Sequence, residues 1–491
     1  MTITDAFEAL PPVPGARPWP RRVVDADIWR ALAASLAAGE RALLGLWGEA
    51  GSVHMALLDR SSGVAIASLA CANGGFPSVA AVHPPAARFE RAIRDLHGFT
   101  PLGAPDERPW LDHGRWPDSA PRAVGPYPFL PSLGEGLHQI PVGPVHAGII
   151  EPGHFRFTAN GETVVRLEER LGYVHRGVEA LMAGAPLARA QKLAARVSGD
   201  STVAYSLAFA RAVEAALEID VPERAVWLRA LMAELERVAN HLGDIGAICN
   251  DAAFALMLAH CSALREKVLR ACATCFGHRL MMDAVLPGGI AADVADNSEQ
   301  ILRRLVAEIK TKFPRLVELY DNTASLQDRT VTTGRLDPAL ARKFGCGGYV
   351  GRASGRSFDA RRDLPYPPYD RFTFETPVLE AGDVDARIWI RIKEVEQSLG
   401  LIEQILARLP AGKVLATPDQ GSGEGLAIAE GFRGDILVWV RLDGGSVKRC
   451  HLRDPSWLQW PLLEAAIEGN IVADFPLCNK SFNCSYSGHD L

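Results

Sequence analysis

The sequence Arg196-Val197-Ser198-Gly199-Asp200-Ser201 lies within residues 191–214, a segment of helical character. Its two serines are three residues apart and precede a long apolar run. Hydroxyl groups at such a place commonly cap a helix, because they satisfy backbone N–H groups that lack a partner inside it. Taken alone, the stretch therefore predicts only the start of a helix, and its meaning depends on the sequence around it.

Short motifs rich in glycine, histidine, arginine and glutamate flank this stretch on both sides. They occupy residues 143–146 (GPVH), 151–156 (EPGHFR), 169–179 (ERLGYVHRGVE), 234–244 (ELERVANHLGD), 276–279 (FGHR), 287–289 (PGG), 352–355 (RASG), 430–435 (EGFRGD) and 453–456 (RDPS). Together they resemble the large subunit of membrane-bound, energy-converting nickel–iron hydrogenases of the formate-hydrogenlyase type. That family shares its ancestry with the quinone-site subunit of respiratory complex I. The resemblance covers roughly residues 140–491 and is specific because many motifs agree in order.

A second resemblance lies near the N-terminus. Residues 90–99 (ERAIRDLHGF), followed by Pro105 and Asp106, are similar to the signature of the small β-rich accessory subunit of complex I. Large subunits of the formate-hydrogenlyase type carry that module fused at the N-terminus. We therefore expect the following parts: a tail at 1–22, an accessory module at 23–120, a linker at 121–140 and a hydrogenase-like large domain at 141–491.

The periodicity of apolar residues predicts an α+β fold, with a small α+β domain before a mainly helical large domain that carries peripheral β-hairpins. Asn160-Gly161 is a strong hairpin signal inside residues 149–167. Four long helical segments suggest a bundle as the core of the large domain. The expected helices span 25–40, 84–96, 223–248, 254–282, 297–326, 383–409 and 458–468; strands are expected within 43–82 and 414–442, and 345–377 reads as irregular.

Bulk properties exclude several classes of protein. The chain has 491 residues and a net charge of −6, which gives no support for nucleic-acid binding. Its nine cysteines are scattered and odd in number, as in a reduced compartment. We expect no signal peptide and no transmembrane segment, since the longest uncharged run, 61–87, is interrupted by Asn-Gly-Gly-Phe-Pro. The expected location is peripheral, on the cytoplasmic side of the inner membrane, held by partner subunits.

The resemblance implies a nickel site built from two C-x-x-C pairs, because soft thiolates hold such a metal. The first pair falls on Ser198 and Ser201, and the second falls around Ser485. A serine hydroxyl stays protonated at neutral pH and is a poor ligand, so we predict that this chain binds no nickel and no other metal. Cys272 and Cys275 form a C-x-x-C elsewhere, either as a zinc or redox pair or as packing thiols.

The resemblance to complex I also implies half of a quinone site. Its histidine donor corresponds to His154 and the carboxylate partner to Asp251, whereas the tyrosine donor is replaced by Gly199. A histidine at the start of a strand is otherwise a structural residue, and that interpretation stays open. The expected cavity residues are His154, Asp200 and Asp251 as catalytic groups, with Arg196, Ser198, Ser201, Arg279 and Ser485 beside them. Five glutamates have two interpretations: they begin a proton path toward a membrane partner, or they are solvated or form salt bridges. They are Glu168, Glu169, Glu179, Glu234 and Glu236.

The first hypothesis is an oxidoreductase subunit, similar to NADH:quinone oxidoreductase and to hydrogenases, that binds no cofactor of its own apart from a candidate quinone. It would couple electron transfer from an iron–sulfur partner subunit to a quinone-like acceptor or to ion pumping by antiporter-like membrane subunits. The alternative is a non-catalytic assembly scaffold of such a complex. A second alternative is an active nickel–iron hydrogenase with atypical ligands.

Overall fold

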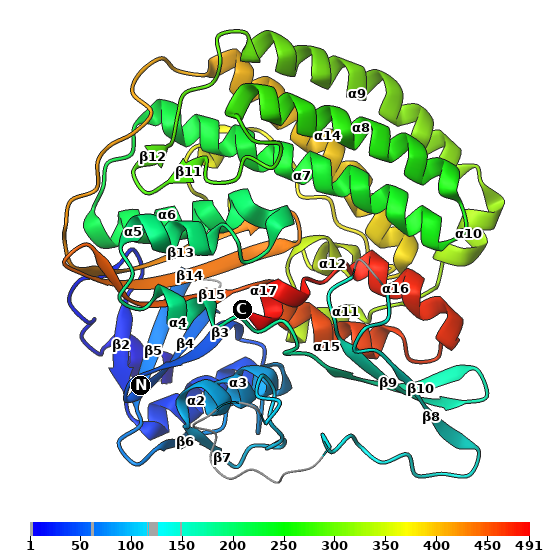
Figure 1. The fold of residues 1–491 in the computed structure, drawn as a ribbon. Helices are drawn as coiled ribbons and strands as arrows, with labels where there is room; N and C mark the ends of the chain where they lie inside the picture. The colour runs from blue at the N-terminus through cyan, green and yellow to red at the C-terminus, as the bar shows by residue number, and fades with distance from the viewer. Residues whose placement is uncertain (1–2, 60–62, 115, 117–125, 148–149) are drawn as a thin grey trace.

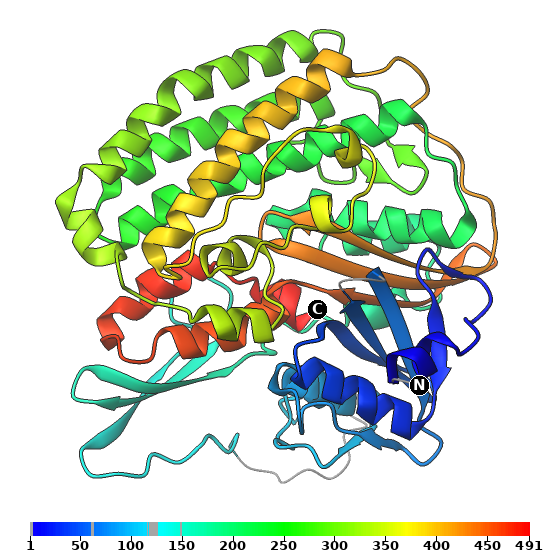
Figure 2. The same cartoon turned by 180° about the vertical axis from the view of Figure 1, so that it is seen from behind.

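The computed structural model describes residues 3–59, 63–114, 116, 126–147 and 150–491. Figure 1 shows three regions stacked in space: a bundle of long helices, a sheet with shorter helices beneath it, and the N-terminal α+β module at the bottom. Figure 2, the view from behind, shows the same stacking, with the N-terminus lying against the module. The α+β class expected from the sequence is confirmed.

The N-terminal module folds into a four-stranded sheet with two helices and a parallel pair of short strands, β6 and β7. Its strand order is β2-β5-β4-β3, in which β3 and β4 and then β4 and β5 pair antiparallel, whereas β2 pairs parallel with β5. Asp25 starts the first helix by accepting hydrogen bonds from the N–H groups of Asp27 and Ile28. The elements are β2 (Arg21–Val24), α2 (Ala26–Ala37), β3 (Arg41–Glu49), β4 (Ser52–Asp59), β5 (Gly63–Ala70), β6 (Gly75–Pro77), η1 (Pro84–Ala86), α3 (Ala87–His97) and β7 (Thr100–Leu102).

The segments on either side of this module are more ordered than a tail and a linker. Residues 1–22 contain α1 (Ile3–Glu8) and β1 (Ala16–Arg17), and β1 pairs parallel with a strand of the large domain. Strand β8 (Leu137–Val142) begins inside the expected linker, crosses its expected end at residue 140, and extends the predicted hairpin into a sheet of order β10-β9-β8. The hairpin strands are β9 (His154–Asn160) and β10 (Thr163–Arg170). Residues 121–125 of the expected linker and 61–62 of the uncharged run lie outside the described residues.

The large domain is built on four long helices, as the periodicity predicts. Each packs on its neighbours in the bundle at the top of Figure 1. The apolar stripe of the first of these helices, from Leu228 to Ile245, is buried at 0–1% exposure. The long helices are α7 (Glu223–Asp251), α8 (Ala255–Phe276), α9 (Ser298–Asp321) and α14 (Val384–Arg408). None of the helices in the described ranges combines the length and the apolar character that crossing a bilayer requires.

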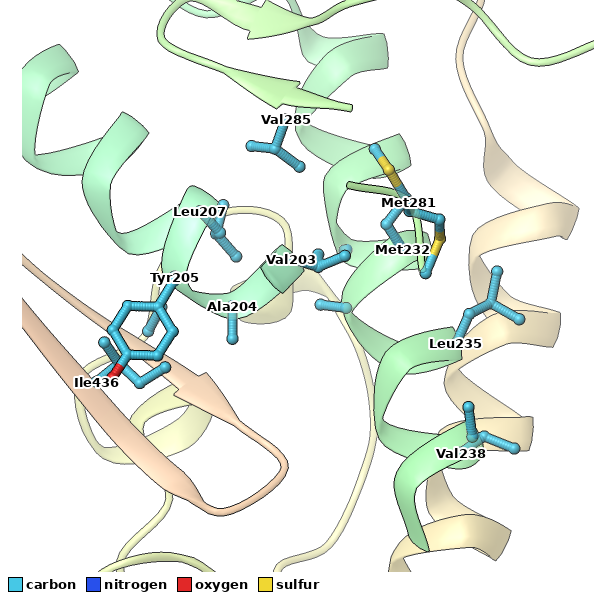
Figure 3. Close-up of a cluster of buried hydrophobic side chains, with 14 of the residues drawn as sticks. Val203, Ala204, Tyr205, Leu207, Met232, Leu235, Val238, Met281, Val285 and Ile436 are labelled. Carbon is cyan, nitrogen blue, oxygen red and sulfur yellow. The ribbon is translucent and has the colours of Figure 1, made fainter. Parts of the chain in front are cut away.

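A sheet of order β1-β13-β14-β15 lies between the bundle and the N-terminal module. The helix α6 (Thr202–Leu217) packs on β13 so closely that a Cβ at Gly425 would lie 1.9 Å from the Ala212 carbonyl oxygen. Figure 3 shows the apolar contacts of α6, with Tyr205 directed toward Ile436 of β14. The strands are β13 (Gly423–Gly431), β14 (Gly434–Asp443) and β15 (Ser446–Arg453), longer than the short strands expected from the sequence.

Short elements complete the large domain and position the candidate site. The segment expected to be irregular contains α12 (Gly348–Ala353), α13 (Ala360–Asp363) and η3 (Tyr369–Arg371). The C-terminal helices lie where β15, the bundle and the N-terminal module meet (Figure 1). The remaining elements are α4 (Val178–Met182), α5 (Leu187–Ala194), η2 (Gly199–Ser201), β11 (Val285–Leu286), β12 (Gly289–Ile290), α10 (Ala324–Thr330), α11 (Pro338–Lys343), α15 (Ser456–Ala466), η4 (Val472–Asp474), α16 (Phe475–Phe482) and α17 (Tyr486–Asp490).

Candidate functional site

Ser198 contacts the C-terminal segment of the chain. Ser198 lies in the turn between α5 and η2, and its Oγ is 3.0 Å from the Oγ of Ser485, which caps α17 by accepting the N–H of Gly488. Ser198 Oγ donates to Asp200 Oδ1 at 2.8 Å. Because each hydroxyl carries one proton, Ser485 donates to Ser198, and the hydrogen bonds run in one direction toward the Asp200 carboxylate.

Arg433, in the turn between β13 and β14, closes this network. Its guanidinium donates to both oxygens of Asp200, at 2.7 and 2.6 Å, and to Ser201 Oγ at 3.2 Å. Its Nε donates to the carbonyl oxygen of Asn483 at 2.6 Å, two residues before Ser485 in sequence. Burial opposes ionisation of Asp200, but the charge and hydrogen bonds of Arg433 outweigh it and lower the pKa of Asp200 to about 2. The pair is therefore ionised at neutral pH.

A second set of polar groups holds the C-terminal side of the network. The Tyr205 hydroxyl on α6 donates to Asp454 Oδ2 at 2.6 Å, and burial raises the pKa of Tyr205. Ser456 connects the two sides, because its N–H donates to Asp454 and its Oγ accepts from the N–H of Ser485. A Cβ at Gly488 would lie 2.4 Å from Asp454 Oδ2, so only glycine allows this approach.

Helix α7 supports the network from the bundle. Asn240 donates from Nδ2 to the Asp200 carbonyl oxygen at 2.7 Å. Glu236 accepts hydrogen bonds from the N–H groups of Val203 and Ala204 at the start of α6, and burial raises its pKa to about 8 despite these hydrogen bonds.

A cavity of about 10 Å³, roughly the volume of one water molecule, adjoins these groups. It is also lined by Arg279, which lies on the surface.

The other expected residues do not join this network. Arg196 and Arg279 lie at the surface, where they pair with Asp283 at 2.7 Å and Glu266 at 2.8 Å. Neither guanidinium is bonded to the network, although Arg279 lines the small cavity beside it. The network itself contains Ser198, Asp200, Ser201 and Ser485 from the expected set.

His154 and Asp251 are not brought together as the resemblance to complex I implies. Both ring nitrogens of His154 have nearby partners: Nδ1 lies 3.3 Å from the carbonyl oxygen of Gly143, just after β8, and Arg156 of the same strand donates to Nε2 at 3.3 Å. Burial lowers the pKa of His154. Asp251 is exposed at the end of α7, and no hydrogen bond or ion pair joins it to His154 among the described residues. The interpretation of His154 as a structural residue accounts for these contacts.

Cys272 and Cys275 are both buried in α8, and burial raises the pKa of each thiol. Within the described part of the chain, no three His, Cys, Asp or Glu side chains are grouped as a metal site. The five glutamates considered for a proton path are buried or half-buried and hydrogen-bonded. Four of them form ion pairs: Glu168 with Arg108, Glu169 with Arg88, Glu179 with Arg449 and Glu234 with Arg361.

Several residues of the network were not among the expected site residues. Arg433, Asp454 and Asn240 lie inside motifs quoted for the resemblance, at 430–435, 453–456 and 234–244. Arg433 could have been identified from its place in a turn after a strand, between Gly431 and Gly434. Turns seldom carry an arginine, because they favour glycine, proline and small polar residues. Its partner Asp200 lies more than two hundred positions away, so only the fold pairs them.

Comparisons with known proteins identify the family. The model of the respiratory-chain NADH dehydrogenase 49 kDa subunit matches residues 251–422, and that of nickel-dependent hydrogenase matches residues 176–243. Formate hydrogenlyase subunit 5 of Escherichia coli is 33% identical over 84% of this chain and 77% of its own length. This chain belongs to that family of large subunits. The resemblance inferred from the motifs is confirmed.

Other members have similar identity. Hydrogenase-4 component G of Escherichia coli is 32% identical over 84% of this chain and 76% of its own. A subunit of the NADH-quinone oxidoreductase of Desulfotalea psychrophila is 31% identical over 68% of this chain and 91% of its own. A chain in the structure of the membrane-bound sulfane sulfur reductase, an archaeal respiratory membrane complex, has a TM-score of 0.69 and 28% identity over 72% of this chain and 99% of its own. The chain is therefore a hydrogenase- and complex I-like subunit with an oxidoreductase-related role.

Proposed function

We propose that this chain is the large subunit of a membrane-associated redox complex that works without a nickel–iron centre. In it, a network of hydroxyl, carboxylate and guanidinium groups joins the segments that would hold the metal. The observation that carries the proposal is the contact between Ser198 and Ser485, 3.0 Å apart although 287 positions separate them in sequence. It supports the equivalence of these serines to the two ligand pairs of the hydrogenases.

The donor set at this place does not suit nickel. Neutral hydroxyls replace the thiolates that soft metals prefer. The Arg433 guanidinium lies 3.2 Å from Ser201 Oγ, so a positive charge beside the serines would repel a metal cation bound there. Cys484, adjacent to Ser485, is buried, and burial raises the pKa of its thiol, which disfavours the thiolate form. The residues at this place therefore do not fit a nickel–iron centre.

Residues of this chain suggest how a change of charge on a partner subunit would affect the rest of the fold. We propose that the iron–sulfur partner docks over the outer side of the site, at Arg196 and Arg279, where its carboxylates could replace Asp283 and Glu266 as partners of the two guanidinium groups. Asp200 and Arg433 lie behind this surface and connect it to the turn between β13 and β14 and to the C-terminal segment. A change of charge on the partner would then act on a rigid network that reaches several elements of the fold.

The acceptor is a separate part of the proposal. A quinone-like acceptor follows from the resemblance to complex I, yet His154 and Asp251 offer it no joined pair of donors. A sulfane sulfur compound is a second candidate, because the solved relative is a sulfane sulfur reductase. The cavity of about 10 Å³ beside Asp200 is too small for a quinone ring, so either acceptor would bind outside the network.

The decisive experiment replaces Ser198 and Ser485 together by alanine in the complex purified through a tag on this chain. If the network takes part in coupling, the complex assembles with its iron–sulfur and membrane subunits, but turnover with a quinone or polysulfide as acceptor falls at least tenfold. Ser422→Ala, which removes an exposed hydroxyl bonded to Asp443, is the control and leaves turnover unchanged. Unchanged turnover in the double variant would support the scaffold alternative, and about one nickel per purified wild-type chain would refute the proposal.

A further inference from the structure

A pocket of about 420 Å³ lies between α6, the start of α7 and the segment that contains η3. Leu207, Arg211 and Glu214 line it from one face of α6, as their spacing of four and three residues requires. Apolar and aromatic residues, among them Val226 and Trp227 of α7, form most of the remaining wall. A pocket of this volume with few polar groups is typical of a small-molecule site.

Two of the three arginines that line this pocket already have carboxylate partners. Arg229 donates to both oxygens of Glu214, and Arg371 donates to Glu223 at 2.6 Å. Arg211 is the third, and no carboxylate in the described part of the chain forms an ion pair with it. Its positive charge is therefore the one that the pocket leaves without a counter-ion.

The guanidinium of Arg211 is held in place with donors to spare. Its Cζ lies 4.0 Å from the centroid of the Tyr366 ring, and its Nη1 donates to the carbonyl oxygen of Ile428. Nε and Nη2 form no hydrogen bond with the residues that the structure describes, and both stay accessible to solvent. Because the side chain is half-buried and lines the pocket beside Tyr366, a ligand in the pocket can reach these two N–H groups.

The electrostatics of the pocket favour an anion at Arg211. Burial lowers the pKa of Arg211, and the opposing charges of Glu214 and Arg229 do not reverse this effect. Asp220, the remaining carboxylate of the pocket, is exposed and forms no ion pair with Arg211. The start of α7 adds positive potential, since its N-cap is Pro222 and no side chain caps it. A ligand with a negative charge would supply the missing counter-ion.

The free donors and the neighbouring charges define this ligand further. Nε–H and Nη2–H of an arginine point in the same direction along one edge of the guanidinium, which matches the two oxygens of a carboxylate. A second negative charge would find no second free arginine and would lie near the carboxylates of Glu214 and Glu223. The aromatic and aliphatic wall suits an apolar body, so the ligand carries one charge at one end.

We propose that this pocket binds a small monocarboxylic acid with an aromatic body. Its carboxylate accepts hydrogen bonds from Nε and Nη2 of Arg211, and its ring packs against Val226 and Trp227. The site shares no residue with the network around Asp200 and is independent of the function proposed for that network.

The first test compares ligands on the full-length wild-type chain by isothermal titration calorimetry. The probe is 2-naphthoate, and the comparison ligands are 2-naphthylmethanol, which lacks the charge, and naphthalene-2,6-dicarboxylate, which carries two charges. We expect one saturable site for 2-naphthoate and at least tenfold weaker binding of each comparison ligand. The absence of saturable binding, or equal binding of 2-naphthoate and 2-naphthylmethanol, would overturn the proposal.

The second test removes the charge that the ligand would pair with. Arg211→Gln should weaken binding of 2-naphthoate at least tenfold. Arg356→Gln is the matched control and should bind normally: Arg356 is also half-buried, lies 4.5 Å from the ring centroid of Phe358 and donates to the carbonyl oxygen of Cys346, but it lines a different pocket. Normal binding by Arg211→Gln, or an equal loss in both variants, would refute the role of Arg211.

A third variant tests the location. Val226 is half-buried on the pocket wall, so Val226→Phe should fill part of the pocket and abolish binding of 2-naphthoate. Undiminished binding by this variant would place the ligand elsewhere and overturn the proposal. Should Arg211→Gln fail to fold, the comparison of the three ligands on the wild type and the result for Val226→Phe decide the outcome.

Discussion

Replacing Arg433 by glutamine tests whether the ion pair with Asp200 holds the candidate site together. Arg433 is buried, with 6% of its side chain exposed, and it donates to both carboxylate oxygens of Asp200 and to the Asn483 carbonyl. Glutamine keeps a polar group of smaller size but removes the charge and the bidentate geometry. Asp200 then remains as a carboxylate whose counter-ion is gone.

The expected loss of stability follows from the burial of the two partners. Removing one member of a buried ion pair costs about 3–5 kcal/mol. The side chain of Asp200 is 35% exposed, so water screens part of its charge and we expect the lower end, about 3 kcal/mol. The loss should also depend on pH. Arg433 holds the pKa of Asp200 at about 2, below its usual 3.8, so the stabilisation is present above pH 3.8 and is lost as the pH falls toward 2.

The assay is equilibrium urea unfolding of the wild-type chain and the variant, followed by tryptophan fluorescence, between pH 7 and pH 2.5. The matched control is Arg371→Gln, whose partner Glu223 is 58% exposed, and it should change stability by less than about 0.5 kcal/mol. The reasoning is refuted if Arg433→Gln is no more destabilising than this control. It is also refuted if the difference from the wild type stays constant as the pH falls.

Three further predictions concern the interior. Glu236 has its pKa raised from 4.5 to about 8 by burial, so the wild type should lose stability as the pH rises through this range, whereas the melting temperature of Glu236→Gln should change less between pH 6 and 8.5; parallel profiles would contradict this. Arg352 is fully buried between Glu394 and Glu430, so Arg352→Met should cost about 3–5 kcal/mol in urea unfolding, and a variant as stable as the wild type would show that the ion pairs contribute nothing. Gly348 has φ +63°, and a Cβ there would lie 1.9 Å from the Arg433 carbonyl oxygen, so Gly348→Ala should lower the melting temperature strongly, whereas Gly400→Ala, in α14 with open space around it, should not.

Much of the fold could be predicted because patterns within short segments specify individual helices and hairpins. The bundle helices were expected from apolar spacing, and the stripe from Leu228 to Ile245 is buried as the period requires. Asn160-Gly161 marked the hairpin of β9 and β10 for a similarly local reason. Strand β8 was missed because its residues, Leu137–Val142, show little alternation and pair with β9 only through the tertiary fold.

The family and the α+β class follow from the sequence, because motifs and residue types can be read directly along the chain, and the same motifs predict hydroxyls of Ser198, Ser201 and Ser485 where the hydrogenases carry thiols. Which side chains come into contact follows from the packing of the folded chain. Ser198 contacts Ser485 and Asp200 contacts Arg433 across more than two hundred positions, whereas His154 and Asp251 lie on separate elements without a shared interaction. Contacts of such long range depend on how helices and sheets pack, which no local pattern specifies.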